Sequence, residues 1–131
     1  MEGVRTIPEE QPVVHTPKKD RYARARGASQ FWDLWCVSCQ HHLALYQKDG
    51  PGALLRLYLD RIFAPLPQSN WQKKSDLKDV PALKCANCGT LIAVAMIYRP
   101  ERRLALRLIP GTFTKVRSNG TYPPAQKPNQ K

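Results

Sequence analysis

Four cysteines are the residues of this chain whose type and spacing could do chemistry. Cys36 and Cys39 form one CxxC pair, Cys85 and Cys88 form a second, and the 131 residues contain 4 cysteines in all. A two-residue spacer lets both thiolates of a tight turn converge on one ion, and two such turns complete a tetrahedral shell. The sequence therefore predicts one structural Zn²⁺ site. Rubredoxin-type iron and a disulfide or thiol-redox role stay open as alternatives.

The same cysteines argue against catalysis. The predicted metal uses all four, so none remains as a nucleophile, and the closed shell has no position for an activated water. His41 and His42 follow the first pair and either could contact the metal, but we interpret them as ordinary polar residues. The sequence contains no phosphate loop, nucleophile elbow or evident pair of carboxylates. We expect a protein without enzymatic activity.

An internal near-repeat indicates which elements position the two pairs. A shift of 49 residues carries Cys36 onto Cys85 and three leucines of an alternating segment onto three others, namely Leu55, Leu57 and Leu59 onto Leu104, Leu106 and Leu108. Each half then consists of a CxxC turn, an apolar segment, a turn and a second alternating segment. This order predicts two similar knuckle–hairpin units.

The second half is the clearer hairpin. Residues 91–98 are apolar and partly β-branched, residues 99–102 supply a turn, and residues 103–109 alternate with a period of two. The three leucines would face the core, and Arg103 and Arg107 would face solvent.

In the first half, residues 53–63 fit either a helix or a strand, and the near-repeat favours a strand. We predict an all-β fold of two pseudo-repeated CxxC knuckle–β-hairpin units that share one zinc ion. The predicted domain spans residues 31–116, with halves at 31–63 and 82–113 and a loop at 64–80 that Trp71 anchors to the core.

Both ends of the chain are predicted to be flexible and basic. Residues 1–30 form an N-terminal arm with three prolines and no apolar periodicity, and residues 117–131 form a tail rich in Pro, Asn and Lys. No apolar run is long enough to cross a membrane, and the first residues lack the apolar core of a secretory signal. We expect a cytoplasmic protein, where cysteine pairs bind metals rather than form disulfides.

The double CxxC pattern resembles zinc ribbons in general and, more narrowly, the β-tent (Mss4-like) group, which includes the Yippee-type proteins. In that group two small antiparallel sheets meet at a zinc ion held by two CxxC knuckles. The resemblance covers about residues 31–116 and carries over only the four cysteines, as an architectural match. The methionine sulfoxide reductases of the group also need a catalytic cysteine that this chain lacks, so the resemblance does not imply their activity.

The formal net charge of +11 favours an anionic partner. We predict a non-enzymatic zinc protein that binds nucleic acid, with RNA or a ribonucleoprotein preferred over DNA. Cations beside an aromatic residue suit phosphate contact and base stacking. The candidate residues are Lys18, Lys19, Arg21, Arg24, Arg26, Arg56, Tyr58, Arg103 and Arg107. The alternative is a zinc-braced module that docks on an acidic surface of a larger protein complex. No membrane or small-molecule partner is predicted.

Overall fold

The computed structural model describes residues 13–65 and 68–124, and this part of the chain is mostly β, as predicted. Its elements, in chain order, are β1 Val13–Val14, α1 Arg21–Arg26, β2 Ser29–Cys36, β3 His42–Asp49, β4 Arg56–Tyr58, η1 Leu59–Arg61, β5 Ile62–Ala64, η2 Gln68–Lys73, η3 Leu77–Asp79, β6 Leu83–Lys84, β7 Leu91–Tyr98, η4 Arg99–Glu101, β8 Arg103–Leu108, β9 Phe113–Ser118 and β10 Thr121–Tyr122.

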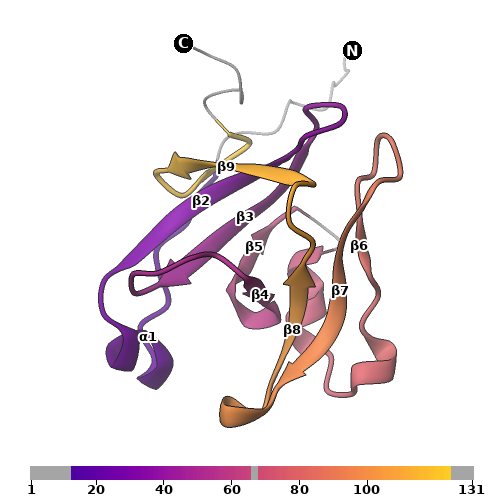
Figure 1. Cartoon of the computed structure of the whole chain (residues 1–131). Coiled ribbons are helices and arrows are strands. Elements are labelled where there is room, and N and C mark those ends of the chain that lie inside the picture. The colour runs from indigo at the N-terminus through magenta and orange to yellow at the C-terminus, as the bar shows by residue number, and fades with distance from the viewer. Residues whose placement is uncertain (1–12, 66–67, 125–131) are drawn as a thin grey trace, which may run out of the picture.

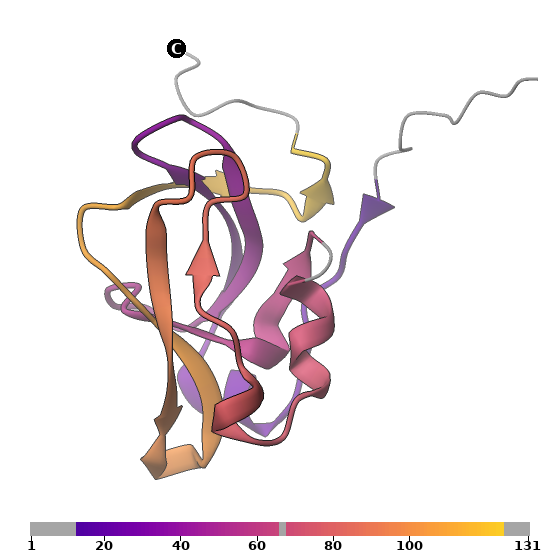
Figure 2. The ribbon, with the colours of Figure 1, turned by 90° about the vertical axis from the view of Figure 1, so that its right-hand side faces the viewer.

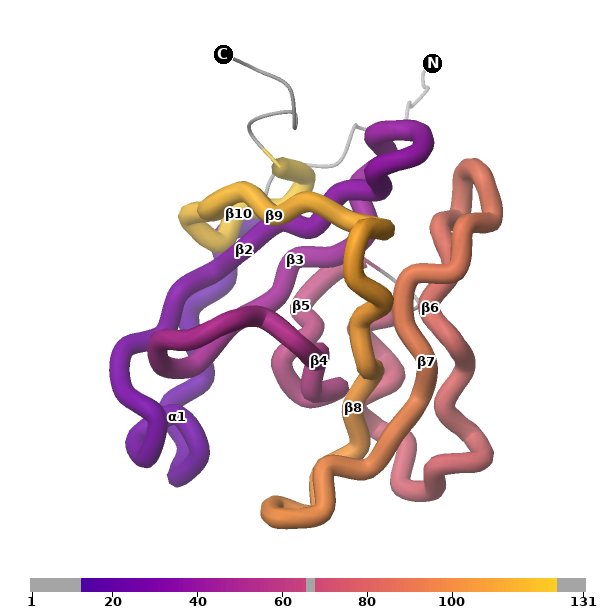
Figure 3. The backbone as a smooth tube through the Cα atoms, in the orientation of Figure 1, coloured from indigo at the N-terminus to yellow at the C-terminus, as the bar shows by residue number. Residues whose placement is uncertain are grey.

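Two four-stranded antiparallel sheets make up the body of the protein (Figure 1). The first sheet has the order β5-β3-β2-β9 and the second has the order β4-β8-β7-β6, while β1 pairs with β10 apart from both. The chain passes from β8 of the second sheet into β9, which lies along β2 of the first sheet (Figure 3). The segment between β8 and β9 therefore connects the two sheets.

The hairpin predicted in the second half is confirmed. β7 and β8 pair in register from Ala93↔Leu108 to Tyr98↔Arg103, and the turn η4 between them ends at Arg102 with a φ of 53°. Alternation along β8 buries Leu106 and Leu108 and leaves Arg107 exposed. The prediction that Arg103 faces solvent is wrong, because this side chain is buried.

The first half differs from the predicted knuckle–hairpin unit. Residues 56–58 form a strand, β4, but it pairs with β8 of the second sheet, where Leu57 lies opposite Leu106. The later strand β5 is the one that pairs with β3. Leu55, predicted to face the core, is 60% exposed. Leu57 and Leu106, equivalent in the near-repeat, thus become partners in one sheet rather than matching positions of two separate units.

Residues 13–30, predicted to belong to a flexible arm, fold against the first sheet. Asp20 caps α1 by accepting hydrogen bonds from the backbone N–H groups of Tyr22 and Ala23, and Ala23 is buried. The backbone N–H of Lys18 donates to the buried side chain of Gln47 on β3. The prediction was wrong for these residues because a six-residue helix is too short to show apolar periodicity. Residues 1–12 lie outside the described residues.

The predicted C-terminal tail also begins later than expected. Residues 117–118 complete β9, and β10 pairs with β1 through Val13↔Tyr122 and Val14↔Thr121. Residues 125–131 lie outside the described residues. The structured part of the chain therefore extends beyond both predicted limits of the domain, 31 and 116.

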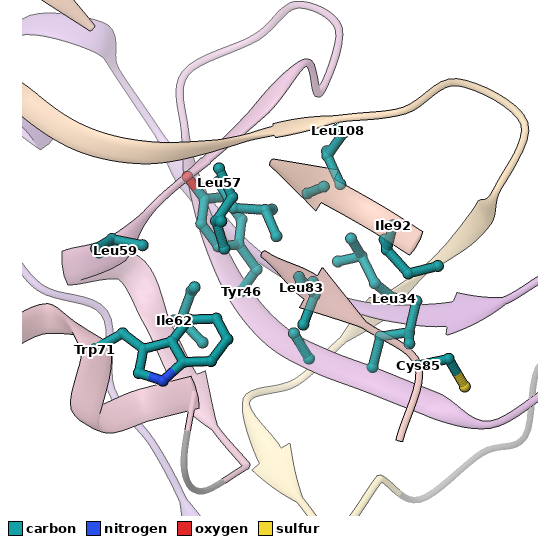
Figure 4. Packing of buried hydrophobic residues seen from close by; sticks show 14 of the residues in the cluster. Leu34, Tyr46, Leu57, Leu59, Ile62, Trp71, Leu83, Cys85, Ile92 and Leu108 are labelled. Atoms are coloured by element: carbon teal, nitrogen blue, oxygen red, sulfur yellow. The ribbon is translucent and has the colours of Figure 1, made fainter. Parts of the chain in front are cut away.

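The main core lies between the two sheets and the helical turns of residues 68–79. Figure 2 shows η2 lying beside β5. Trp71 of η2 is buried against this core, as predicted for the loop at 64–80. Leu34, Leu57, Ile92 and other fully buried side chains from both sheets pack together (Figure 4). Cys36 and Cys85 belong to the same cluster, so the candidate metal site borders the core.

Candidate metal centre and cationic surface

Each CxxC pair forms the turn between two antiparallel strands. Cys36 is the last residue of β2, and β3 returns from the first turn at His42. Cys85 directly follows β6, and β7 returns from the second turn at Leu91. Both turns lie side by side at one end of the molecule (Figure 1). One knuckle therefore belongs to the first sheet and the other to the second.

The two knuckles have the same backbone hydrogen bonds. The N–H of Cys36 donates to the carbonyl oxygen of His41 at 2.9 Å, and the N–H of Cys85 donates to that of Thr90 at 2.9 Å. In each knuckle the first cysteine's carbonyl oxygen accepts from the residue after the second cysteine, at 2.8 Å in both. The two turns are therefore closed by equivalent pairs of backbone hydrogen bonds.

This conformation requires a positive φ after the second cysteine of each pair. Gly89 supplies it in the second knuckle with a φ of 82°, and Gln40 adopts a φ of 66° in the first. Glycine is the residue that usually occupies this region, because a Cβ atom disfavours it. Position 40 is occupied by glutamine rather than glycine, yet its backbone adopts the same left-handed conformation as Gly89.

The four sulfur atoms lie at the spacing of a tetrahedral metal shell. The Sγ atoms of Cys36 and Cys88 are 3.7 Å apart, those of Cys39 and Cys85 are 3.5 Å apart, and all four lie within 4.8 Å of one another. Sulfurs at about 2.3 Å from one central ion sit about 3.8 Å apart at the corners of a tetrahedron, whereas a disulfide needs about 2.05 Å. The four thiols are free and could hold one metal ion.

The two cysteines of the second knuckle differ in how readily they ionise. Burial raises the pKa of the Cys85 thiol to about 11. Hydrogen bonding with Thr90, whose hydroxyl lies 3.0 Å from the Cys88 sulfur, lowers the pKa of Cys88 to about 6. Metal ligation needs all four thiolates, and a bound cation favours the deprotonated form of each. A metal would therefore overcome the desolvation that disfavours the Cys85 thiolate.

The two histidines after the first knuckle have other roles. The Nε2 atom of His42 lies 2.8 Å from a carboxylate oxygen of Asp33, and its ring packs edge-on against Trp35. His41 is exposed, and its backbone carbonyl is the group that closes the knuckle. Among the described residues, the cluster of possible metal ligands at this place consists of the four cysteines.

The nucleic-acid residues predicted on the sheet do gather on one face of the second sheet. Arg56 lies directly opposite Arg107 across β4 and β8, and Tyr58 lies opposite Ala105 between Arg103 and Arg107. Arg56 and Arg107 have no acidic partner among the described residues, so their charges are available to an anion. The Arg56 guanidinium lies over the ring of Tyr98, at 4.3 Å from the ring centroid.

The remaining two predicted residues of that face are used within the fold. The guanidinium of Arg103 lies between the rings of Tyr22 and Tyr58, at 4.0 and 3.9 Å from their centroids. Arg103 also pairs with Asp60 at 2.6 Å and with Glu101 at 2.9 Å. Tyr58 is only 7% exposed. Arg103 and Tyr58 are therefore buried and engaged within the fold, which leaves them little surface for contact with nucleic acid.

The predicted cations of the arm divide in the same way. Lys18 donates to the carbonyl oxygen of Asp60, and Arg26 donates to Glu101 and to the Tyr58 hydroxyl, so both are held within the fold. Three others remain exposed on or next to α1, and these are Lys19, Arg21 and Arg24. The structure therefore leaves only part of the predicted basic arm open to a partner.

Two hollows on either side of the turn at residues 50–53 were not predicted from the sequence. The first hollow has a volume of about 280 Å³, and its lining includes Arg26, Lys48, Arg56, Tyr58 and Tyr98. The second hollow has a volume of about 260 Å³, and its lining includes Gln30, Trp32, Lys48 and Lys115. Lys48 lines both hollows.

One cation of the second hollow, Lys115, lies on β9, a strand that the sequence-based prediction divided between the domain and its tail. Lys115 and Arg117 are two positions apart on β9 and so lie on the same face of the sheet. Both lie over the ring of Trp32, at 4.2 and 5.5 Å from its centroid. Trp32 is only partly buried against the core. The spacing of Lys115 and Arg117 indicates two cations on one face of a strand. Their position beside Trp32 follows only from the pairing of β9 with β2.

Comparison with known proteins adds no family to this picture. No family model, curated protein or solved structure matches the chain. The resemblance to the β-tent group therefore stays a prediction. Within residues 13–65 and 68–124, no helix is long and apolar enough to span a membrane.

Proposed function

We propose that this chain is a non-enzymatic nucleic-acid-binding protein whose two sheets are held together by a structural zinc ion. Zinc is the metal that four thiolates at tetrahedral spacing fit best, with Cys36, Cys39, Cys85 and Cys88 as its ligands. A shell of four thiolates has no open position for a substrate, which supports a structural role.

The observation that carries the nucleic-acid part is a set of unpaired cations held beside aromatic rings. Arg56, Lys115 and Arg117 lie over aromatic rings, and Arg107 lies opposite Arg56 across β4 and β8. None of the four has a carboxylate partner among the described residues. Most other buried or half-buried arginines of the described chain are neutralised, as with Arg61 by Asp49 and Asp20. Cations without a carboxylate partner are the groups that phosphates can engage at the least cost, since no internal ion pair must break.

The proposal is tested by filter binding to RNA and DNA across a salt series. The variant Arg56→Ala/Arg107→Ala removes two adjacent cations of one sheet, and Lys73→Ala/Lys78→Ala removes two exposed cations from the helical turns as a matched control. Loss of two phosphate contacts should weaken binding and flatten the salt slope by about 1.4 for a single strand, at about 0.7 for each phosphate. The variant with the control pair replaced should retain most of the affinity and most of the salt slope.

Two results would count against the proposal. Negligible affinity for any nucleic acid at about 0.05 M salt would exclude it, because phosphate contacts are strongest at low salt. If the chain has no affinity for nucleic acid but forms a stable association with a protein partner that survives nuclease treatment, the alternative of a docking module for a larger complex is favoured.

A further inference from the structure

We propose that the two hollows beside the turn at residues 50–53 seat an unpaired stretch of a polynucleotide, with one base in each hollow and the phosphates on the surrounding cations. This inference rests on the proposed nucleic-acid binding and names the form of nucleic acid that the site takes: a single strand rather than a duplex.

Each hollow combines the two groups that single-strand recognition requires. The first hollow presents the ring of Tyr98 with the Arg56 guanidinium over it, and the second presents the ring of Trp32 with the Lys115 ammonium over it. Aromatic rings and guanidinium planes stack on bases, and ammonium groups bind phosphates. The same pair of chemical groups therefore occurs twice, once on each sheet.

A shared wall makes the two hollows one site. Lys48, near the end of β3, lines both, and the turn that separates them begins directly afterwards at Gly50. The Lys48 ammonium donates to the carbonyl oxygen of Gly50 at 2.6 Å. A phosphate lying over this turn would be contacted by Lys48 while the bases on its two sides enter the two hollows.

The size of the hollows favours a chain of small units over one large ligand. Their volumes of about 280 and 260 Å³ are at the small end of the range of roughly 300–1,000 Å³ that is typical of ligand pockets. Two small hollows joined by a cation suit a polymer that repeats a planar group and a charge. The bases of a duplex are stacked and paired, so they cannot enter recesses with aromatic walls unless they are flipped out.

The charge balance around Lys48 also favours a polyanion. Burial, together with the nearby charges of Lys115 and Arg26, lowers the pKa of Lys48. The carboxylate that lines the first hollow belongs to Asp49, which is buried and held by Arg61 at 2.8 Å. An incoming phosphate would therefore meet like-charged cations whose mutual repulsion it relieves, without competition from a free carboxylate.

Fluorescence anisotropy with the full chain tests the inference. The probes are labelled oligouridylate, oligothymidylate of the same length, and a blunt duplex of matched charge. The aromatic variants are Trp32→Leu and Tyr98→Leu, which keep apolar bulk but cannot stack, and Trp32→Phe, which can. Lys48→Ala removes the shared cation, and Lys78→Ala is its exposed control. Metal content and thermal midpoint identify any variant that fails to fold.

The single strands should bind more tightly than the duplex. Each leucine variant should lose about tenfold in affinity for the single strand and little for the duplex, and Trp32→Phe should stay close to the parent. Lys48→Ala should weaken single-strand binding and flatten its salt slope by about 0.7, unlike Lys78→Ala. Tighter binding of oligouridylate would identify RNA as the partner, and tighter binding of oligothymidylate would identify DNA; either result supports the inference.

Failure of this inference differs from failure of the proposed function. Equal affinity for single strand and duplex, or parental affinity in folded Trp32→Leu, Tyr98→Leu and Lys48→Ala, would overturn the single-strand site and leave nucleic-acid binding intact. Absence of binding to all three probes at low salt would overturn both.

Discussion

Replacement of one buried metal ligand, Cys85→Ser, should unfold the protein largely as a unit. Cys85 is 2% exposed and belongs to the core cluster with Leu83 and Ile92, so its sulfur lies where the knuckle meets the packed interior. Serine supplies a hydroxyl that stays neutral at pH 7 and binds zinc far more weakly than a thiolate. The three remaining cysteines would then form an incomplete shell.

The expected loss of stability follows from comparing the free energy of zinc binding with the free energy of unfolding of a small domain. Structural zinc contributes about 10–16 kcal/mol in small zinc-binding peptides, and a domain of this size has a net stability of about 5–15 kcal/mol. Loss of only about half of the metal contribution would equal the whole stability of a marginal domain. The unfolded fraction should therefore dominate at room temperature, in the variant and in the parent treated with a chelator.

The assay combines metal analysis with amide dispersion by NMR and urea unfolding. Ser38→Ala is the matched control, because Ser38 is an exposed residue of the first knuckle that lies between its two cysteines. The control should bind one metal per chain and unfold at the parental midpoint. Native-like amide dispersion in metal-free Cys85→Ser would refute the reasoning, because the core would then stand without the metal. Parental protein that binds no metal after reduction would refute it too.

Two further predictions concern the buried guanidinium of Arg61, which is 1% exposed. Asp49→Asn removes the buried carboxylate that pairs with Arg61 at 2.8 Å and leaves the guanidinium to the more exposed Asp20. Urea unfolding should therefore show a loss of about 1.5–3 kcal/mol, against little change for the exposed control Asp79→Asn. The hydrogen bond from Arg61 holds the pKa of Asp20 well below its usual value. The ionised Asp20 carboxylate therefore contributes its full stabilisation of the folded state above a pH of about 4, and this contribution falls as the pH drops below that value. Asp20→Asn should therefore flatten the acid limb of a plot of unfolding free energy against pH, and an unchanged acid limb would contradict this assignment.

The sequence predicted those parts of the protein that depend on local spacing. The four cysteines come together as their two-residue spacers required, and alternation along residues 103–108 correctly indicated a hairpin with 91–98. Both signals lie within a few residues of the structure they specify.

The parts that were missed depend on contacts between distant residues. β4 pairs with β8 across a sequence separation of about 50 residues, and no local pattern distinguishes this pairing from a hairpin with β3. Arg103 is buried because Tyr22 of the arm covers it, and the arm itself is fixed by the ion pair of Asp20 with Arg61. An arginine on an alternating strand normally faces solvent, so only knowledge of this cover would have corrected the prediction.

The candidate metal site and the two hollows lie at opposite ends of the same hairpin. β2 and β3 pair from Trp35↔His42 beside the first knuckle to Ser29↔Asp49 beside the turn at residues 50–53, a span of about 20 Å at roughly 3.3 Å per residue. The hollows take Lys48 from the first sheet and Arg56 from the second, so their shape depends on how the two sheets are held together. A metal that binds one knuckle from each sheet would fix the relative position of the two sheets without contacting the nucleic acid. Nucleic-acid affinity and bound metal should accordingly be lost together on chelation, and the affinity should return when zinc is restored.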